Sequence, residues 1–209
     1  LYNGYDAHTF YPKTLVIESF DITFIGKYYS HYQDCPRLLF AALQNLIATN
    51  QIAVDEVKVH FYTNAVGQAD FAKLAKEYTL DNVVRVHNYI PRSEIVDRMH
   101  HSSIMLVLTT PIKQYGTHGM MGTKFYEILG VEKPCLCLNS DEECLAEAIK
   151  NTHAGLAATY VEDVKAFILE KYQEWKANGY THQLVINKEQ FTRQHEAEQF
   201  EQVFLQCIK

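Results

Sequence analysis

Residues 104–108 read Ile104-Met105-Leu106-Val107-Leu108, a run in which every side chain is apolar. Side chains of a strand point alternately to two faces, so such a run is stable only where both faces of the sheet are covered. Sheets covered on both faces are almost always parallel, because the helices that connect parallel strands lie over them. The run therefore predicts a buried strand of a parallel α/β sheet.

Strand-like and helical patterns alternate on both sides of this run. Apolar or β-branched stretches predict strands at 20–25, 57–62, 83–87, 135–138 and 155–158. Three- and four-residue apolar spacings predict helices at 36–47, 71–78, 93–101 (with Ser93 as N-cap), 123–131 and 141–150, and the chain after residue 158 is expected to be helical. This order predicts a Rossmann-like, doubly wound parallel sheet of about six strands with helices on both faces.

Composition restricts the class of protein. The 209 residues are 47% hydrophobic and 21% charged, which suits one globular domain spanning 1–209. The net charge of −6 argues against a nucleic-acid partner, although a single phosphate needs only one or two cations. No apolar run is long enough to span a bilayer, and we expect a cytoplasmic protein. The chain begins with Leu1 rather than Met, so we expect a fragment of a longer protein.

The least regular stretch lies between the strand at 104–108 and the helix at 123–131, and it contains Gly116, Gly119 and Gly122. Glycine allows close backbone approach to a ligand, and the free amides of a helix N-terminus favour phosphate. The glycine spacing matches neither the dinucleotide-binding fingerprint nor a Walker P-loop. A phosphate-binding loop and an ordinary surface loop are therefore equal alternatives on this evidence.

Lys124 and Glu127 follow this loop, three residues apart on the predicted helix. Lys124 is suited to neutralise phosphate oxygens, and Glu127 can accept hydrogen bonds from two vicinal hydroxyls of a ribose. The alternative is an exposed ion pair without a ligand role.

The order Gly122-Thr123-Lys124-Phe125-Tyr126-Glu127, continued to Lys133-Pro134, resembles a segment of the group 1 family of glycosyltransferases with the GT-B fold. Asn3-Gly4-Tyr5-Asp6 with Phe10 is similar to the segment by which such enzymes enter their C-terminal domain. Phe24-Ile25-Gly26-Lys27 resembles the first strand and its loop. Residues 83–91 with Glu94 and Ile95 resemble the part that abuts the nucleobase. The resemblance extends to about Trp175.

This resemblance implies one half of a GT-B fold, the C-terminal domain that binds a nucleoside-diphosphate sugar and transfers the sugar, a hexosyl group, to an acceptor hydroxyl. It implies that Glu127 binds the ribose, and that Lys27 and Lys124 stabilise the leaving diphosphate as catalytic cations. The other implied donor contacts are Gly26, Gly119, Gly122 and Thr123 at the diphosphate and Tyr89 and Ile90 at the base. No metal ion or other cofactor is expected.

The resemblance also implies a missing N-terminal acceptor domain, with residues 1–12 as the linker from it and residues 188–208 as a C-terminal helix. The isolated chain would then bind donor without turnover. A full-length protein of this kind remains compatible with peripheral membrane association.

Two departures from the family pattern bear on the site. Many members have a further glutamate near the donor sugar, at the position of Gly119 here. The family also often has a second cation shortly after the first loop, whereas no basic residue other than His31 lies between Lys27 and Arg37. We therefore expect weaker phosphate affinity, or Lys124 in place of the missing charge.

Two alternatives to the glycosyltransferase interpretation stay open: a non-enzymatic Rossmann-like module that binds a nucleotide or a protein, and the C-terminal half of a GT-B sugar-nucleotide epimerase. A receiver-like module would need aspartates after the first strand, and Asp21 is not placed there.

Three smaller expectations concern cysteine, histidine and the chain end. The scattered cysteines Cys35, Cys135, Cys137, Cys144 and Cys207 are expected to be free thiols. His100 and His101 are expected to cap carbonyls at a helix end, and His118 lies in the glycine loop with an open role. The apolar residues of the C-terminal helix, at 200, 204 and 208, predict either core packing or an interface left uncovered.

Overall fold

A computed structural model describes residues 3–29, 36–109, 121–140 and 143–207. These residues form a six-stranded sheet in the order β3-β2-β1-β4-β5-β6, in which every neighbouring pair is parallel. The strands are β1 (Phe20–Ile25), β2 (Val57–Tyr62), β3 (Val84–His87), β4 (Ile104–Leu108), β5 (Cys135–Leu138) and β6 (Gly155–Ala158). The predicted α/β fold and strand number are confirmed.

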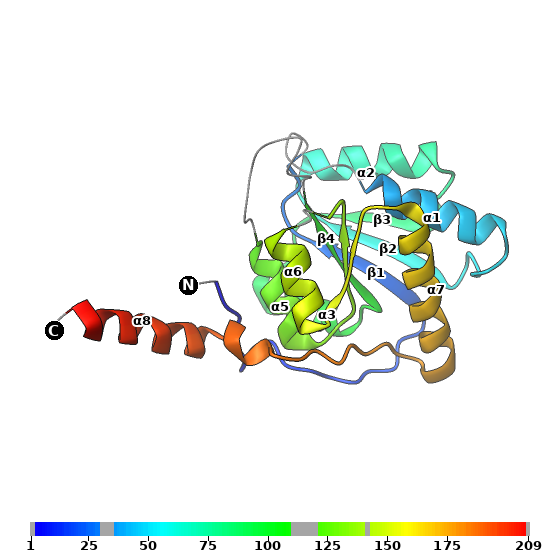
Figure 1. Cartoon of the computed structure of the whole chain (residues 1–209). Helices are drawn as coiled ribbons and strands as arrows, with labels where there is room; N and C mark the ends of the chain where they lie inside the picture. The colour runs from blue at the N-terminus through cyan, green and yellow to red at the C-terminus, as the bar shows by residue number, and fades with distance from the viewer. Residues whose placement is uncertain (1–2, 30–35, 110–120, 141–142, 208–209) are drawn as a thin grey trace.

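Helices cover both faces of this sheet (Figure 1). One face carries α1 (Arg37–Ala48), α2 (Ala65–Glu77) and α7 (Val161–Asn178), and the other carries α3 (Arg92–His100), α5 (Thr123–Val131) and α6 (Cys144–Thr152). Alternate residues of β1, β2, β4, β5 and β6 join the two separate apolar cores, as the period of two requires. In β4, for example, Leu106 packs with α1 and α7, whereas Met105 packs with α5.

The chain after α7 corrects the expectation that it is helical throughout. Residues 180–187 are irregular and bond to the amino edge of the sheet, where Gln183 N donates to Glu132 O and Ile186 N donates to Thr152 O. A short 3-10 helix (Lys188–Phe191) and α8 (Arg193–Cys207) follow. Gly179, with φ of 77°, ends α7 in the left-handed conformation that favours glycine.

Three helix boundaries were wrong by a few residues. Helix α2 begins at Ala65 rather than near Phe71, because Asn64 supplies an extended N-cap and the small Gly67 packs against Thr63. Helix α3 begins at Arg92 with Pro91 as N-cap, so Ser93 is not the cap; Glu94 N donates to Pro91 O in the first turn. Helix α6 ends at Thr152, two residues later than predicted.

The segment before β1 is anchored to the chain that precedes α8. Tyr5 pairs with Thr192 in a parallel bridge, and a Cβ on Gly4 would approach the Arg193 backbone nitrogen to 2.9 Å. Asp6 accepts hydrogen bonds from His8 N and Thr9 Oγ1, which fixes a turn, and Phe10 is buried. The spacing Asn-Gly-x-Asp…Phe therefore has a structural explanation here.

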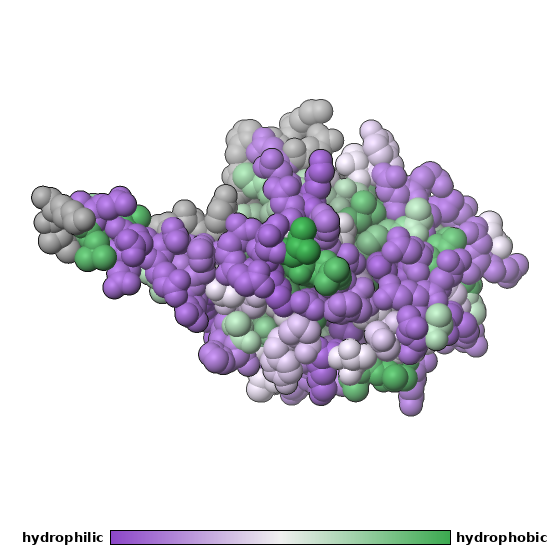
Figure 2. All heavy atoms as spheres, turned by 60° about the horizontal axis from the view of Figure 1, so that its bottom comes forward, coloured by the Kyte–Doolittle hydropathy of each residue, from purple (hydrophilic) through white to green (hydrophobic). Residues whose placement is uncertain are grey.

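Helix α8 extends away from the body of the molecule (Figure 1). Its apolar residues gather toward the free end, where Figure 2 shows them as a patch on an otherwise hydrophilic helix. The exposed residues of this patch are Phe200, Val203, Phe204 and Leu205. In the described chain they do not take part in the core, so the core-packing alternative is wrong for this helix; residue 208 lies outside the described residues.

Candidate functional site

The three segments predicted to form one site all follow the carboxyl ends of strands. Gly26 and Lys27 come directly after β1, Tyr89 and Ile90 come after β3, and Gly122 precedes α5 on the connection from β4. Because all six strands are parallel, their carboxyl ends meet at one edge of the sheet. Ligands of doubly wound sheets bind at this edge.

Helix α5 begins here without a side-chain cap. Its N-cap is Gly122, and its first turn contains no acidic residue. Lys124 adds its charge to the positive end of the helix dipole, and its ion pair with Glu127 offsets part of that charge. The N-terminus of α5 therefore has the charge and the amides of an anion site.

Gly122 stands at φ −69°, which any residue adopts, and a Cβ added to it would meet no atom within 4 Å. The glycine is therefore required neither by the backbone conformation nor by a close neighbour in the described chain. The described residues thus leave room beside Gly122 for a ligand. Gly116, His118 and Gly119 lie outside the described residues.

Lys124 and Glu127 form an ion pair, with Lys124 Nζ 2.5 Å from Glu127 Oε2. Both are partly buried, with 27% and 16% of their side chains exposed. The described residues give Glu127 Oε1 no hydrogen bond, so this oxygen and the Lys124 ammonium remain able to accept and donate toward a ligand. The ion-pair interpretation and the ligand interpretation of these residues are thus compatible.

Lys27 is exposed and lies over the Tyr29 ring, with Nζ 4.5 Å from the ring centroid. The loop that carries it is held by Asn64, which accepts from Tyr28 N at 2.9 Å and donates to Tyr28 O at 3.2 Å. Because the backbone of this loop is held and the Lys27 side chain is exposed, the ammonium can move to a ligand at the sheet edge without a change in the fold.

The turn after β3 presents its side chains to solvent. Tyr89 is 54% exposed and Ile90 is partly buried. Gln68 of α2 braces the turn by donating to Asn88 Oδ1 and to Thr63 O, each at 3.0 Å. An exposed aromatic ring on a braced turn is a suitable surface for stacking a base.

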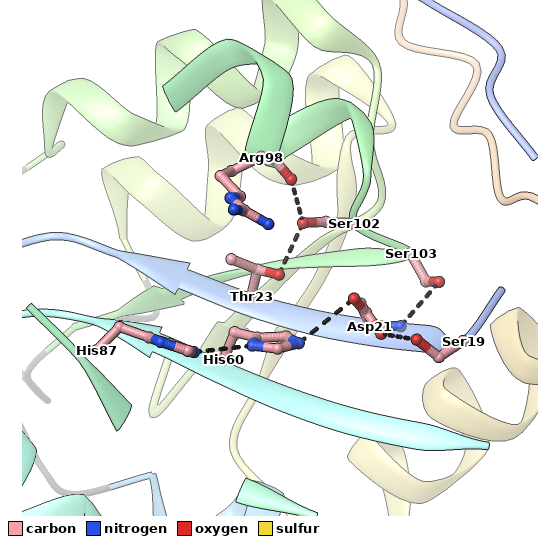
Figure 3. Close-up of polar contacts among 8 residues, drawn as sticks. All are labelled: Ser19, Asp21, Thr23, His60, His87, Arg98, Ser102 and Ser103. Atoms are coloured by element: carbon pink, nitrogen blue, oxygen red, sulfur yellow. Dashed lines mark hydrogen bonds and ion pairs between the residues drawn. The ribbon is translucent and has the colours of Figure 1, made fainter. Parts of the chain in front are cut away.

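A polar cluster that the sequence did not predict crosses β1, β2 and β3 (Figure 3). His87, the last residue of β3, places Nε2 3.0 Å from His60 Nδ1, and His60 Nε2 is 3.4 Å from Asp21 Oδ2. Tyr62 stacks on His87 with ring centroids 4.4 Å apart. The residues come from three neighbouring strands and lie on one face, so only the β1-β2-β3 register brings them together.

Burial, and then the nearby charges of His60, Arg98 and Arg85, lower the pKa of His87 below its usual value. The 3.0 Å contact is a hydrogen bond in which neutral His87 can donate from Nε2 to His60 Nδ1. Protonation of both histidines would place two N–H groups against each other. Asp21 itself lies near the amino end of β1, which excludes a receiver-type aspartate at the carboxyl end of that strand.

Other expectations about chemistry have mixed outcomes. The described cysteines Cys135, Cys137, Cys144 and Cys207 are free, as predicted, and Cys35 lies outside the described residues. His101 Nδ1 caps the carbonyl of Asp97 at 2.8 Å, whereas His100 bonds to Tyr11 O of another segment. Across the described ranges, no three His, Cys, Asp or Glu side chains gather as metal ligands, and no helix has the length and apolarity that crossing a membrane requires.

Several solved structures that share this fold are glycosyltransferases. Sucrose-phosphate synthase from Thermosynechococcus elongatus matches 99% of this chain with a TM-score of 0.67 and 14% identity. The C-terminal domain of the group 1 family glycosyl transferase LpcC from Francisella tularensis matches 85% of this chain and 95% of its own length, with a TM-score of 0.58 and 11% identity. Pneumococcal O-GlcNAc transferase GtfA in complex with UDP and GlcNAc matches 98% with a TM-score of 0.63 and 12% identity.

The chain spans 51% of the synthase and 38% of GtfA, but nearly all of the LpcC C-terminal domain. It therefore has the fold of the C-terminal domain of a GT-B, group 1 glycosyltransferase. No protein-family model and no curated protein sequence matches it.

Proposed function

We propose that this chain is the donor-binding domain of a glycosyltransferase, which binds a nucleoside-diphosphate sugar for transfer to an acceptor hydroxyl. One observation supports the proposal most strongly. The uncapped N-terminus of α5, with Gly122, Lys124 and Glu127, lies at the same sheet edge as the ends of β1 and β3. A nucleoside diphosphate has three parts, the diphosphate, the ribose and the base, and each part needs a neighbouring surface to bind it.

In the proposed complex the amides of Thr123 and Lys124 and the ammonium groups of Lys27 and Lys124 hold the diphosphate, beside Gly26. Glu127 Oε1 accepts from a ribose hydroxyl, since Oε2 is engaged by Lys124. Tyr89 and Ile90 contact the base. Gly119 is assigned to the diphosphate by the family resemblance.

The chemistry follows from the charge that develops on the leaving group. As the bond between sugar and phosphate breaks, negative charge grows on the diphosphate and positive charge grows on the sugar. Cations and aimed amides stabilise the leaving group electrostatically, in a site where they are already oriented. This assigns to Lys27 and Lys124 a catalytic role without proton transfer, and no metal ion is required for it.

We propose that the acceptor site belongs to an N-terminal domain and that this chain alone binds donor without turnover. The exposed apolar patch on α8 is the surface we assign to contact with that domain, because apolar residues gathered on a projecting helix favour burial. We propose a cytoplasmic location, with membrane association only through the rest of the protein.

Calorimetric titration with UDP, GDP, ADP and TDP tests the proposal, with UDP first because the GtfA structure contains it. We expect one nucleotide to bind with a dissociation constant between about 1 μM and about 1 mM, the usual range for enzyme substrates. Backbone NMR shifts on binding should include Gly26, Tyr89 and Gly122. If no nucleotide binds, or if the shifts lie elsewhere, the proposal is wrong.

A second assay separates the transferase from an epimerase of the same fold. The matching UDP-, GDP-, ADP- or TDP-sugar is incubated with the chain, and the sugar products are analysed. We expect the donor sugar to be recovered unchanged. Conversion of the bound sugar into its epimer would show the alternative activity.

A further inference from the structure

Lys133 is the most deeply buried charged side chain among the described residues. It precedes Pro134 and β5, which places it at the amino edge of the sheet, opposite to the proposed nucleotide site. The residue is only 2% exposed, and its ammonium nitrogen has no hydrogen-bond partner in the described chain. Buried amines without partners are rare because burial removes the water that solvates them.

Lys133 also lines a small cavity of about 80 Å³. Three chain segments enclose it: residues 12–14, residues 131–133 and residues 181–182. Lys13 and His182 are exposed at its rim, and Thr181 is held in place by donating to Ser103 O at 2.6 Å. The cavity therefore combines a buried ammonium with two further nitrogen-bearing side chains.

The carboxylates nearest to this cavity already have partners. Glu132 Oε1 accepts from Lys188 at 2.5 Å, and its Oε2 is 3.7 Å from His182 Nε2. Glu174 accepts from Lys171 Nζ and from the His182 backbone. Lys13 forms no ion pair with any described residue. Glu132 also lines the cavity, but its oxygens face Lys188 and His182, so neither Lys13 nor Lys133 has an ion pair of its own with a described residue.

Burial lowers the pKa of Lys133 to about 8, and the charge of Glu174 opposes this effect without cancelling it. At neutral pH the amine is still mostly protonated, so the cavity holds a positive charge whose solvation is lost. An anion that donates no hydrogen bond and accepts several would restore this solvation.

We propose that this cavity is an anion site, in which Lys133, Lys13 and His182 bind a small tetrahedral oxyanion such as phosphate or sulfate. The site is independent of the proposed nucleotide site, because the two lie at opposite edges of the sheet. Its size admits a group of a few heavy atoms and excludes a nucleotide.

Sulfate is the probe, because its charge stays constant over the pH range in which Lys133 titrates. Backbone NMR shifts are recorded during a sulfate titration at constant ionic strength, with chloride as the balancing anion. We expect saturable shifts at Val131, Thr181 and His182. Affinity should fall at least about tenfold from pH 7 to pH 9, as Lys133 loses its proton.

Lys133→Met is the deciding variant, and Lys58→Met is its control because Lys58 is an exposed lysine of β2. We expect Lys133→Met to weaken sulfate binding at this cavity at least about tenfold and Lys58→Met to leave it unchanged. Nucleotide affinity should be unaltered in both variants. Absence of saturable shifts at the cavity in the wild type, or equal sulfate affinity in Lys133→Met, would overturn the proposal.

Should Lys133→Met fail to fold, the pH dependence in the wild type decides: constant affinity from pH 7 to pH 9 would exclude Lys133 as a ligand. Inorganic phosphate and glycerol phosphate then distinguish the source of the anion. Tighter binding of glycerol phosphate than of inorganic phosphate assigns the site to a phosphate group on a larger molecule, and tighter binding of inorganic phosphate assigns it to the free anion.

Discussion

Lys124 and Glu127 show how one contact serves both stability and ligand binding. Their i, i+3 ion pair limits the cost of a lysine in the first turn of α5, and it leaves Glu127 Oε1 without a described partner. A ligand that carries both phosphate and vicinal hydroxyls would complement this pair. The residue types therefore define the expected ligand more narrowly than the fold does.

Replacing Gly122 by alanine tests whether the glycine is needed for nucleotide binding or for the backbone conformation. Because its φ is −69° and a Cβ would meet no atom of the described residues within 4 Å, we expect Gly122→Ala to change the free energy of unfolding by less than about 1 kcal/mol. The added methyl group should obstruct the diphosphate and weaken nucleotide binding at least about tenfold. Denaturant unfolding and calorimetry measure the two effects; a large stability loss with unchanged affinity would contradict the assignment.

The His60–His87 contact predicts a pH dependence of stability. The pKa of His87 is lowered in the folded protein, so below about pH 6.5 the unfolded state binds a proton that the folded state resists. The stabilising contribution of neutral His87 is therefore present above about pH 6.5, and it is lost as the pH falls through the pKa of His87 in the folded protein. One such proton gives a slope of at most about 1.4 kcal/mol per pH unit.

His87→Gln should reduce this slope. His100, whose pKa is also lowered, titrates in the same range, but it is present in both proteins and cancels in their difference. The measurement is the free energy of unfolding of both proteins at several pH values between about 5 and 8. Equal slopes in the two proteins would show that the histidine contact does not resist protonation.

At the scale of elements, α5 is positioned by a close approach at its far end. A Cβ on Gly130 would lie 2.7 Å from Tyr5 and 2.8 Å from Phe10, so only glycine lets the segment before β1 pack on this helix. The segment before β1 and α5 are thereby fixed to each other. The contacts at Gly130, near the C-terminus of α5, therefore also fix the position of its N-terminus at Gly122.

Gly130→Ala tests this packing and complements the Gly122 variant. We expect a loss of about 1–3 kcal/mol in the free energy of unfolding, because backbone and ring atoms must move to admit the methyl group. Nucleotide affinity of the remaining folded protein should change less than in Gly122→Ala. Wild-type stability in this variant would show that the approach is looser than described.

Element identities were predictable from the sequence, but several boundaries were not. Apolar and β-branched stretches located all six strands; the signal is continuous in the buried β4 and β5, and it is interrupted by polar residues such as Lys58 and Arg85 in β2 and β3. The start of α2 was missed because its first residues, including Val66 and Gly67, carry no amphipathic pattern. The irregular segment 180–187 was missed because its hydrogen bonds are made to distant residues such as Glu132 and Thr152.

At the scale of the whole molecule, the parallel topology confirms which edge of the sheet these segments share. Residues that follow strand ends lie at one edge once all strands are parallel, so chain order assigns Gly26, Tyr89 and Gly122 to the same edge, and their role in binding stays a prediction. The His60–His87 pair and the buried Lys133 could not be foreseen, because strand register and long-range packing create them. The residues next to them in the sequence predict neither the histidine contact nor the burial of Lys133.

The central claim is that Glu127 binds a ribose, and Glu127→Gln tests it most directly. Charge-assisted hydrogen bonds contribute roughly 1.5–3 kcal/mol, so nucleoside-diphosphate affinity should fall about tenfold to a few hundredfold. The melting temperature without ligand should hardly change, since a pair of this kind contributes at most about 1 kcal/mol.

Glu162→Gln is the matched control, because Glu162 and Lys165 form an i, i+3 ion pair on α7, away from the proposed site. It should alter neither quantity. The measurement is the dissociation constant and the melting temperature of the three proteins under one set of conditions. Our account predicts lost affinity at constant stability for Glu127→Gln alone; unchanged affinity with a lowered melting temperature would contradict it.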